Sequence, residues 1–246
     1  SALQLAVVAA SAAAVPPPGG PPPRRPDRRE LAAALRLGLP VGLHMGAEVG
    51  IFALVGFLAA RLGALPLASH QLAISLASLT FTVAVGFGNA GSVRVGWAVG
   101  ARDREAARRA GLAAFGAGAS FMALTALVFF AFPGAVARLM TDDPALIAAA
   151  VPLLRVAAVF QISDGLQAVG AGVLRGAGET RFTFLANVVG HWALGFPAAV
   201  VLGFTAGGGV TGLWWGFVLG LSAVGAALFA RFLRVSAREI APLERS

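Results

Sequence analysis

The stretch from Ala145 to Leu174 reads ALIAAAVPLLRVAAVFQISDGLQAVGAGVL and carries two formal charges, Arg155 and Asp164. An α-helix rises about 1.5 Å per residue, so this stretch is long enough to cross a hydrocarbon core of about 30 Å. A run this long and this apolar is typical of a transmembrane helix. We therefore expect a membrane-spanning helix that carries one acid near its middle.

The rest of the chain has the same character. Hydrophobic residues make up 58% of it, charged residues 12%, and the mean hydropathy is +0.81, whereas soluble domains average about 25% charged residues. The absence of cysteine excludes disulfides and cysteine-ligated metals. The net charge of +8 comes from arginines that lie mostly between apolar runs, so we interpret it as a signal of membrane topology and expect no nucleic-acid partner.

Six apolar spans predict an all-α, polytopic membrane protein built as a six-helix bundle. They cover residues 37–62, 67–99, 106–132, 145–174, 182–204 and 210–233. We expect Pro40 in the first turn of the first helix, where a missing N–H is tolerated. Pro152 and Pro197 fall inside spans and predict kinks. Gly212, Gly216 and Gly220 repeat every four residues and predict close helix packing in the last span.

The spans define one membrane lobe, residues 31–236, between two differing ends. Residues 1–30 combine a short apolar stretch with a Pro- and Arg-rich linker, which we expect to be extended. The apolar stretch suits the tail of a preceding helix or aberrant sequence, with a signal peptide as the alternative. Residues 237–246 form a predicted cytoplasmic tail.

Arginine positions predict the orientation. Fifteen arginines lie on the side that holds both ends of the lobe, and two, Arg61 and Arg138, lie on the opposite side. Loops rich in arginine face the cytoplasm. We therefore expect a multi-pass protein of the cell (inner) membrane with both ends of the lobe cytoplasmic.

Glu48 and Asp164 are the two acids that fall near the middle of spans; the other nine lie in loops, tails or linkers. An ionised carboxylate at that depth costs at least about 2.5–3.5 kcal/mol, so it must pair, bind a cation, face water or take up a proton. The alternative is a neutral acid that hydrogen-bonds to a neighbouring helix. One acid in each of two spans favours an ion or proton site.

Polar neighbours support this interpretation. His44 lies four residues before Glu48, on the same helix face. Asn187 and His191 form a second pair with this spacing, and Gln161 and Gln167 flank Asp164 at three residues on either side. Single polar groups in membrane helices are often only interhelical contacts. If they converge on one cavity, they would provide ligands for Na⁺ or a proton relay.

An acidic cavity with aromatic walls would also attract lipophilic organic cations, partly through cation–π contacts. The candidate wall residues are Phe52, Phe81, Phe87 and Phe160. A driving ion and an organic cation would then compete for the same negative charge, which is the simplest basis for antiport. We expect no cofactor beyond the coupling ion, H⁺ or Na⁺, with Na⁺ held at Glu48 and Asp164.

Several motifs resemble the multidrug and toxic compound extrusion (MATE) family. They are Leu37-Gly38-Leu39-Pro40 with Glu48-Val49-Gly50, Ser69-His70-Gln71, Gly91-Ser92-Val93-Arg94-Val95-Gly96, Gln161-Ile162-Ser163-Asp164-Gly165-Leu166-Gln167, Leu174-Arg175-Gly176-Ala177-Gly178-Glu179-Thr180-Arg181 and Gly212-Leu213-Trp214-Trp215-Gly216. The chain is most similar to the NorM-type branch, which uses membrane acids in its C-terminal lobe. By this resemblance Glu48 and Asp164 match cation-site positions.

The resemblance implies an exporter of organic cations driven by H⁺ or Na⁺, of which this chain is the C-terminal half. Family members have two six-helix lobes around a central cleft. The expected partner is therefore an N-terminal six-helix lobe or a second copy of this one. Phe81 and Ala84 depart from the pattern, because they stand where an aromatic hydroxyl and a proline occur in some relatives.

Three alternatives remain open at this stage. A flippase for lipid-linked oligosaccharides would line its cleft with cations, whereas here Arg94 and Arg155 are the arginines that approach membrane depth. An intramembrane enzyme lacks support, because no HExxH or carboxylate-rich metal motif lies in a span. A non-transporting membrane fragment would tolerate replacement of both buried acids.

Overall fold

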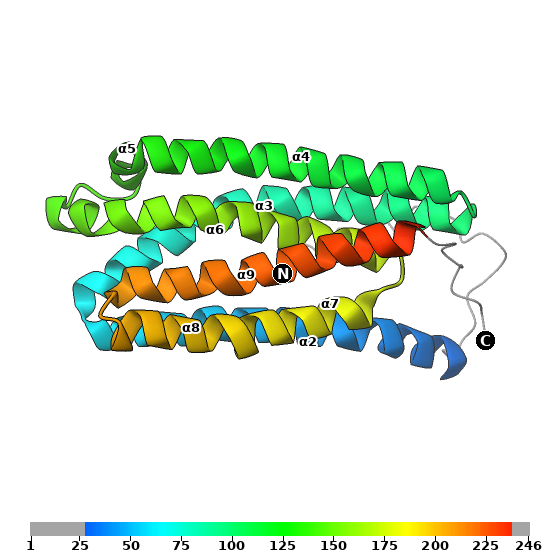
Figure 1. Ribbon diagram of the computed structural model, residues 1–246, viewed down its shortest axis with the longest axis horizontal. Coiled ribbons are helices and arrows are strands. Elements are labelled where there is room, and N and C mark those ends of the chain that lie inside the picture. The colour runs from blue at the N-terminus through cyan, green and yellow to red at the C-terminus, as the bar shows by residue number, and fades with distance from the viewer. Residues whose placement is uncertain (1–27, 238–246) are drawn as a thin grey trace, which may run out of the picture. The chain divides into compact units, whose positions relative to one another are not determined.

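The computed structural model describes residues 28–237, which are helical apart from short turns. The elements are α2 (Arg28–Leu62), α3 (Ala64–Gly100), α4 (Arg104–Ala131), α5 (Pro133–Arg138), α6 (Pro144–Gly176), α7 (Thr180–Asn187), the π-helix η1 (Val188–Gly195), α8 (Phe196–Val200), the π-helix η2 (Val201–Thr205) and α9 (Gly209–Ala237) (Figure 1). The predicted apolar stretch and most of the linker, as well as the predicted tail from residue 238 onward, lie outside the described residues.

The chain divides after Leu39 into two compact units. In the first unit, the described residues are 28–39, which form the first turns of α2. Arg28 and Arg29 were expected in an extended linker, but they are helical. Pro40 was predicted in the first turn of its helix. Because α2 begins at Arg28, Pro40 lies inside the helix instead.

Six helical segments are long and apolar enough to cross a membrane. They are Gly38–Leu62, Ala64–Gly100, Arg104–Ala131, Pro144–Gly176, Thr180–Thr205 and Gly209–Ala237. The prediction of an all-α, six-helix membrane bundle is confirmed. The second segment begins three residues earlier than expected because Gly63 alone separates α2 from α3. Its φ of +126° is a backbone conformation that other residues rarely adopt.

The fifth span is not one regular α-helix. It contains α7, η1, α8 and η2 in succession, with Pro197 in the first turn of α8. Proline has no N–H to donate to the preceding turn, and wider π-turns commonly absorb such an interruption. Pro197, where a kink was predicted, thus lies in a short α-helix with a π-helical segment on either side.

Helix α6 packs closely against α3, α4 and α9, and α3 packs against α4 (Figure 1). Helix α9 also packs against η1, α8 and η2. Glycines permit these approaches. A Cβ on Gly220 would lie 2.9 Å from Gly195 Cα, and one on Gly216 would overlap the backbone of Ala199. The predicted glycine ridge on α9 thus lies against η1 and α8, where side chains would not fit.

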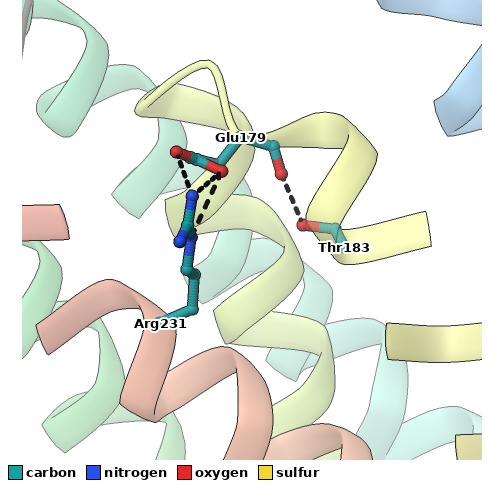
Figure 2. A network of polar contacts seen from close by, with 3 residues as sticks. All are labelled: Glu179, Thr183 and Arg231. Carbon is teal, nitrogen blue, oxygen red and sulfur yellow. Dashed lines mark hydrogen bonds and ion pairs between the residues drawn. The ribbon is translucent and has the colours of Figure 1, made fainter. Parts of the chain in front are cut away.

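The turn between α6 and α7 is held to α9 by an ion pair (Figure 2). Arg231 Nη2 donates to both carboxylate oxygens of Glu179 at 2.9 Å, and its Nε donates to Oε2 at 3.3 Å. The Thr183 hydroxyl donates to the Glu179 main-chain carbonyl oxygen at 3.0 Å. The guanidinium also lies 5.1 Å from the centre of the Phe182 ring.

Two apolar clusters occupy the two halves of the second unit, which begins at Pro40. One gathers the residues near the α2–α3 turn, including Val55, Ala73 and Trp214; the other includes Val95, Phe115 and Phe232. Along α6 the first cluster ends at Phe160 and the second begins at Val169. The polar residues of α6 therefore lie between two apolar layers, at the middle of the bundle.

Candidate functional site

A cavity of about 640 Å³ lies between α2, α3 and α6. On each of these helices the residues that line the cavity recur at helical spacing, so they share one face of the helix. The lining residues that carry polar or aromatic groups are His44, Glu48, Phe52, Ser78, Phe81, Asn89, Phe160, Asp164, Gln167 and Arg175. Valine, alanine, isoleucine and methionine side chains complete the walls. The cavity is thus mostly apolar, with a polar group of residues at one level.

Both predicted membrane acids face this cavity. Glu48 comes from α2, ten residues beyond the start of its span at Gly38, and Asp164 comes from α6, twelve residues before its end at Gly176. At about 1.5 Å per residue, they lie about 15 and 18 Å from the arginine-rich ends of their spans. These depths are close to the middle of a core of about 30 Å.

The two carboxylates face the same cavity from α2 and α6. His44 Nε2 is 3.4 Å from Glu48 Oε2, and the Gln167 amide lies beside the same carboxylate. Asp164 is only 3% exposed. Within residues 28–237, neither Asp164 Oδ1 nor Gln167 Oε1 has a hydrogen-bond partner.

These unpaired oxygens are suited to a cation. A hard ion such as Na⁺ is bound by carboxylate and amide oxygens, and a proton needs a carboxylate with a nearby acceptor. Glu48, Asp164 and Gln167 supply both kinds of oxygen at one level of the cavity. The described residues contain no cluster of three or more His, Cys, Asp or Glu side chains of the kind that holds a transition metal.

Aromatic rings form the end of the cavity nearer the α2–α3 turn. The ring centres of Phe52 and Phe160 are 6.2 Å apart in an edge-to-face arrangement, and Phe52 lies 4.8 Å from Phe217. Trp214 packs 5.1 Å from Phe160 and its Nε1 donates to His70 Nδ1 at 3.1 Å. Trp214 is itself fully buried.

The opposite end of the cavity holds a cation that sequence reasoning had assigned only to topology. Arg175 lines the cavity, and its Nη2 donates to Asn89 Oδ1 at 3.1 Å. The sequence contained a signal that Arg175 faces the cavity. Phe160, Asp164, Gln167, Ala171 and Arg175 repeat every three or four residues and therefore share one face of α6.

Four predicted site residues do not line the cavity. Phe87 points away from it, into a second groove between α3 and α4, and packs 6.2 Å from Phe121. Val85 and Asn89 do line the cavity, and Phe87 lies two residues from each, on the far side of the helix. Its predicted place in the cavity wall was therefore wrong.

The other three are Gln161, Asn187 and His191, which are at most 1% exposed and lie inside the bundle. His191 Nδ1 is 3.2 Å from the Asn187 carbonyl oxygen. Within the described part of the chain, the side-chain amides of Gln161 and Asn187 have no partner. These residues extend the polar layer away from the cavity.

A bundle of six apolar helices with two carboxyl groups facing an internal cavity defines a multi-pass membrane protein. The MatE family model matches residues 40–201, and the chain belongs to this family. It is 43% identical over 224 residues to the multidrug resistance protein NorM of Burkholderia vietnamiensis, covering 89% of this chain and 48% of the relative. A protein named probable multidrug resistance protein NorM, from Deinococcus radiodurans, is 41% identical over 209 residues, with coverages of 83% and 46%.

The fold agrees with solved structures of this class. The eukaryotic MATE transporter AtDTX14 superposes with a TM-score of 0.77 at 21% identity, over 82% of this chain and 46% of that one. An outward-facing multidrug resistance MATE family transporter superposes with a TM-score of 0.74 at 22% identity, over 86% and 47%. The chain thus spans about half the length of the relatives that it matches.

Proposed function

We propose that this six-helix unit is the cation-coupled C-terminal lobe of a multidrug exporter, which expels organic cations in exchange for H⁺ or Na⁺. The observation that carries this proposal is the pair of carboxylates, Glu48 and Asp164, facing one cavity from two different helices. The names of the relatives, multidrug resistance proteins, agree with it.

The exchange follows from electrostatics. With both acids ionised and the cavity open to water, two negative charges in a mostly apolar space attract any cation that fits. Phe52 and Phe81 offer apolar surface and ring faces to the organic part of such a cation, and the buried Phe160 packs behind Phe52. When H⁺ or Na⁺ neutralises the acids, the attraction is lost and the organic cation is released.

A second lobe completes the transporter in this proposal. Alternating access requires two lobes that rock about a cleft, and the relatives are about twice as long as the part this chain matches. The partner would be an N-terminal six-helix lobe or a second copy of this one. We place the unit in the cell (inner) membrane with its arginine-rich loops in the cytoplasm.

A flippase for lipid-linked sugars is less well supported. It would need several cations to hold a diphosphate, and among the described lining residues Arg175 is the only arginine. Arg175 is engaged by Asn89, and the two acids outnumber it. Arg155, one of the two arginines expected to approach membrane depth, is exposed and does not line the cavity.

The test is ion-driven efflux of ethidium from proteoliposomes that contain the complete transporter. A pH gradient and a Na⁺ gradient are imposed separately, which identifies the coupling ion. Glu48→Gln and Asp164→Asn remove one charge each with little change in shape, and we expect each to abolish the gradient-driven component. Glu105→Gln, which removes an exposed acid on α4, is the matched control. Unchanged efflux in both cavity variants would refute the assignment.

A further inference from the structure

A second groove, of about 480 Å³, runs between α3 and α4 near the turn that joins them. Its floor and walls are alanines with Gly91 and Phe87, and two guanidinium groups, Arg94 and Arg109, border it. We propose that this groove binds an anionic phospholipid of the cytoplasmic leaflet, with the phosphate between the two arginines and an acyl chain along the alanine-lined part.

The two arginines lie at the same depth. Arg94 is six residues before the end of α3 at Gly100, and Arg109 is five residues after the start of α4 at Arg104. At about 1.5 Å per residue they are about 9 and 7.5 Å from the ends of two helices joined by a short turn. Because both side chains line the same groove, one phosphate could contact both guanidinium groups at once.

This depth corresponds to the edge of the hydrocarbon core. Helix α4 has 28 residues, so it is about 42 Å long and extends about 6 Å beyond each side of a core of about 30 Å. Trp97, one turn after Arg94, is 76% exposed, and tryptophan is enriched at membrane interfaces. The backbones of the two arginines thus lie near the edge of the hydrocarbon core, from which a long arginine side chain reaches outward to a lipid phosphate.

The charges around the groove favour an anion. Arg94 takes part in none of the ion pairs found within residues 28–237. Arg109 pairs with Glu105 at 2.8 Å, but both side chains are largely exposed, and exposed pairs of this spacing are weak and readily exchanged. Asp103, the other nearby acid, caps α4 by accepting from Ala106 N at 2.8 Å.

The apolar part of the groove favours a lipid over a free anion. Ala90, Ala110, Ala113 and Ala114 have short side chains that leave an open channel, and Phe87 lines the same groove. Phosphate alone would not use this surface, whereas an acyl chain can fill it and make packing contacts with the alanines. We therefore assign the site to a phospholipid with a negative headgroup.

The experiment uses the full chain, purified in a neutral detergent, with bound lipid counted by native mass spectrometry. Dioleoyl phosphatidylglycerol and dioleoyl phosphatidylcholine share their acyl chains and differ in headgroup charge. We expect Arg94→Gln and Arg109→Gln each to lower the affinity for phosphatidylglycerol about fivefold, since one arginine near an anionic surface contributes a factor of this size. Arg94→Lys keeps the charge and should retain most of the binding.

Matched controls separate this site from the general basic character of the loop. Arg108 is next to Arg109 but does not line the groove, so Arg108→Gln should leave the affinity unchanged. Ala113→Phe fills the channel and should weaken binding, whereas Leu112→Phe, outside it, should not. The proposal is overturned if Arg108→Gln is as harmful as Arg94→Gln, or if Ala113→Phe has no effect. It is also overturned if inorganic phosphate binds the groove in place of the lipid.

Discussion

Replacement of Gly172 by alanine should force α3 and α6 apart. The Cβ of an alanine there would lie 2.7 Å from Gly88 Cα, and closer still to the carbonyl carbon and oxygen of Gly88. Carbon atoms in contact are normally about 3.5–4.0 Å apart, so the two backbones must separate by about 1 Å. No flexible side chain can move aside, because all three obstructing atoms belong to the backbone.

The size of the effect follows from the extent of the interface. Helices α3 and α6 pack against each other along much of their length, and a gap of about 1 Å loses a quarter to a half of the dispersion energy of each affected contact. Extra atoms in a well-packed interior typically cost about 1–3 kcal/mol. We expect the free energy of unfolding of Gly172→Ala to fall by this amount.

The measurement is unfolding in mixed micelles at increasing sodium dodecyl sulfate, followed by far-UV circular dichroism. Gly86→Ala is the matched control, because nothing lies within 4 Å of its ideal Cβ, and alanine has the higher helix propensity. Gly86→Ala should be as stable as the parent or slightly more stable. If Gly172→Ala proves as stable as Gly86→Ala, the close contact between α3 and α6 is incorrect.

Two further predictions concern polar contacts. Ser163 Oγ and Ser222 Oγ lie 2.7 Å apart. A double-mutant cycle of Ser163→Ala and Ser222→Ala should therefore give a coupling energy of about 0.6 kcal/mol, which is the average for hydrogen bonds between membrane helices. If the effects of the two substitutions on the free energy of unfolding are additive, the contact is contradicted. Arg231→Lys cannot reproduce the two-pronged contact with Glu179 and should cost about 0.5–1 kcal/mol, since the pair is partly exposed. Faster hydrogen exchange of amides in the α6–α7 turn would report this loss, and unchanged exchange would show that the ion pair does not hold the turn.

Much of the candidate site could be predicted from helical periodicity. Glu48 and His44 lie one turn apart, and the structure brings them within 3.4 Å of each other. The same periodicity, applied to the row that includes Asp164, would have added Arg175 to the cavity. Applied to α3 it would have excluded Phe87, which is two residues from the lining positions Val85 and Asn89.

Other features had no signal in the sequence. Trp214 and Trp215 are adjacent and chemically alike, yet the first is buried against His70 and the second is partly exposed. Gln161 and Gln167 flank Asp164 symmetrically, yet only Gln167 faces the cavity. In each case the outcome depends on how the helix is rotated about its own axis.

The sequence by itself determined the number of membrane helices and the depth of the two acids, because hydropathy and helical rise are properties of consecutive residues. The tertiary structure alone decided which polar groups share the cavity, which are enclosed in the bundle, and where a second groove opens between α3 and α4. The physical reason is that close packing between distant segments, at contacts such as Gly88 with Gly172, sets the rotation and separation of the helices.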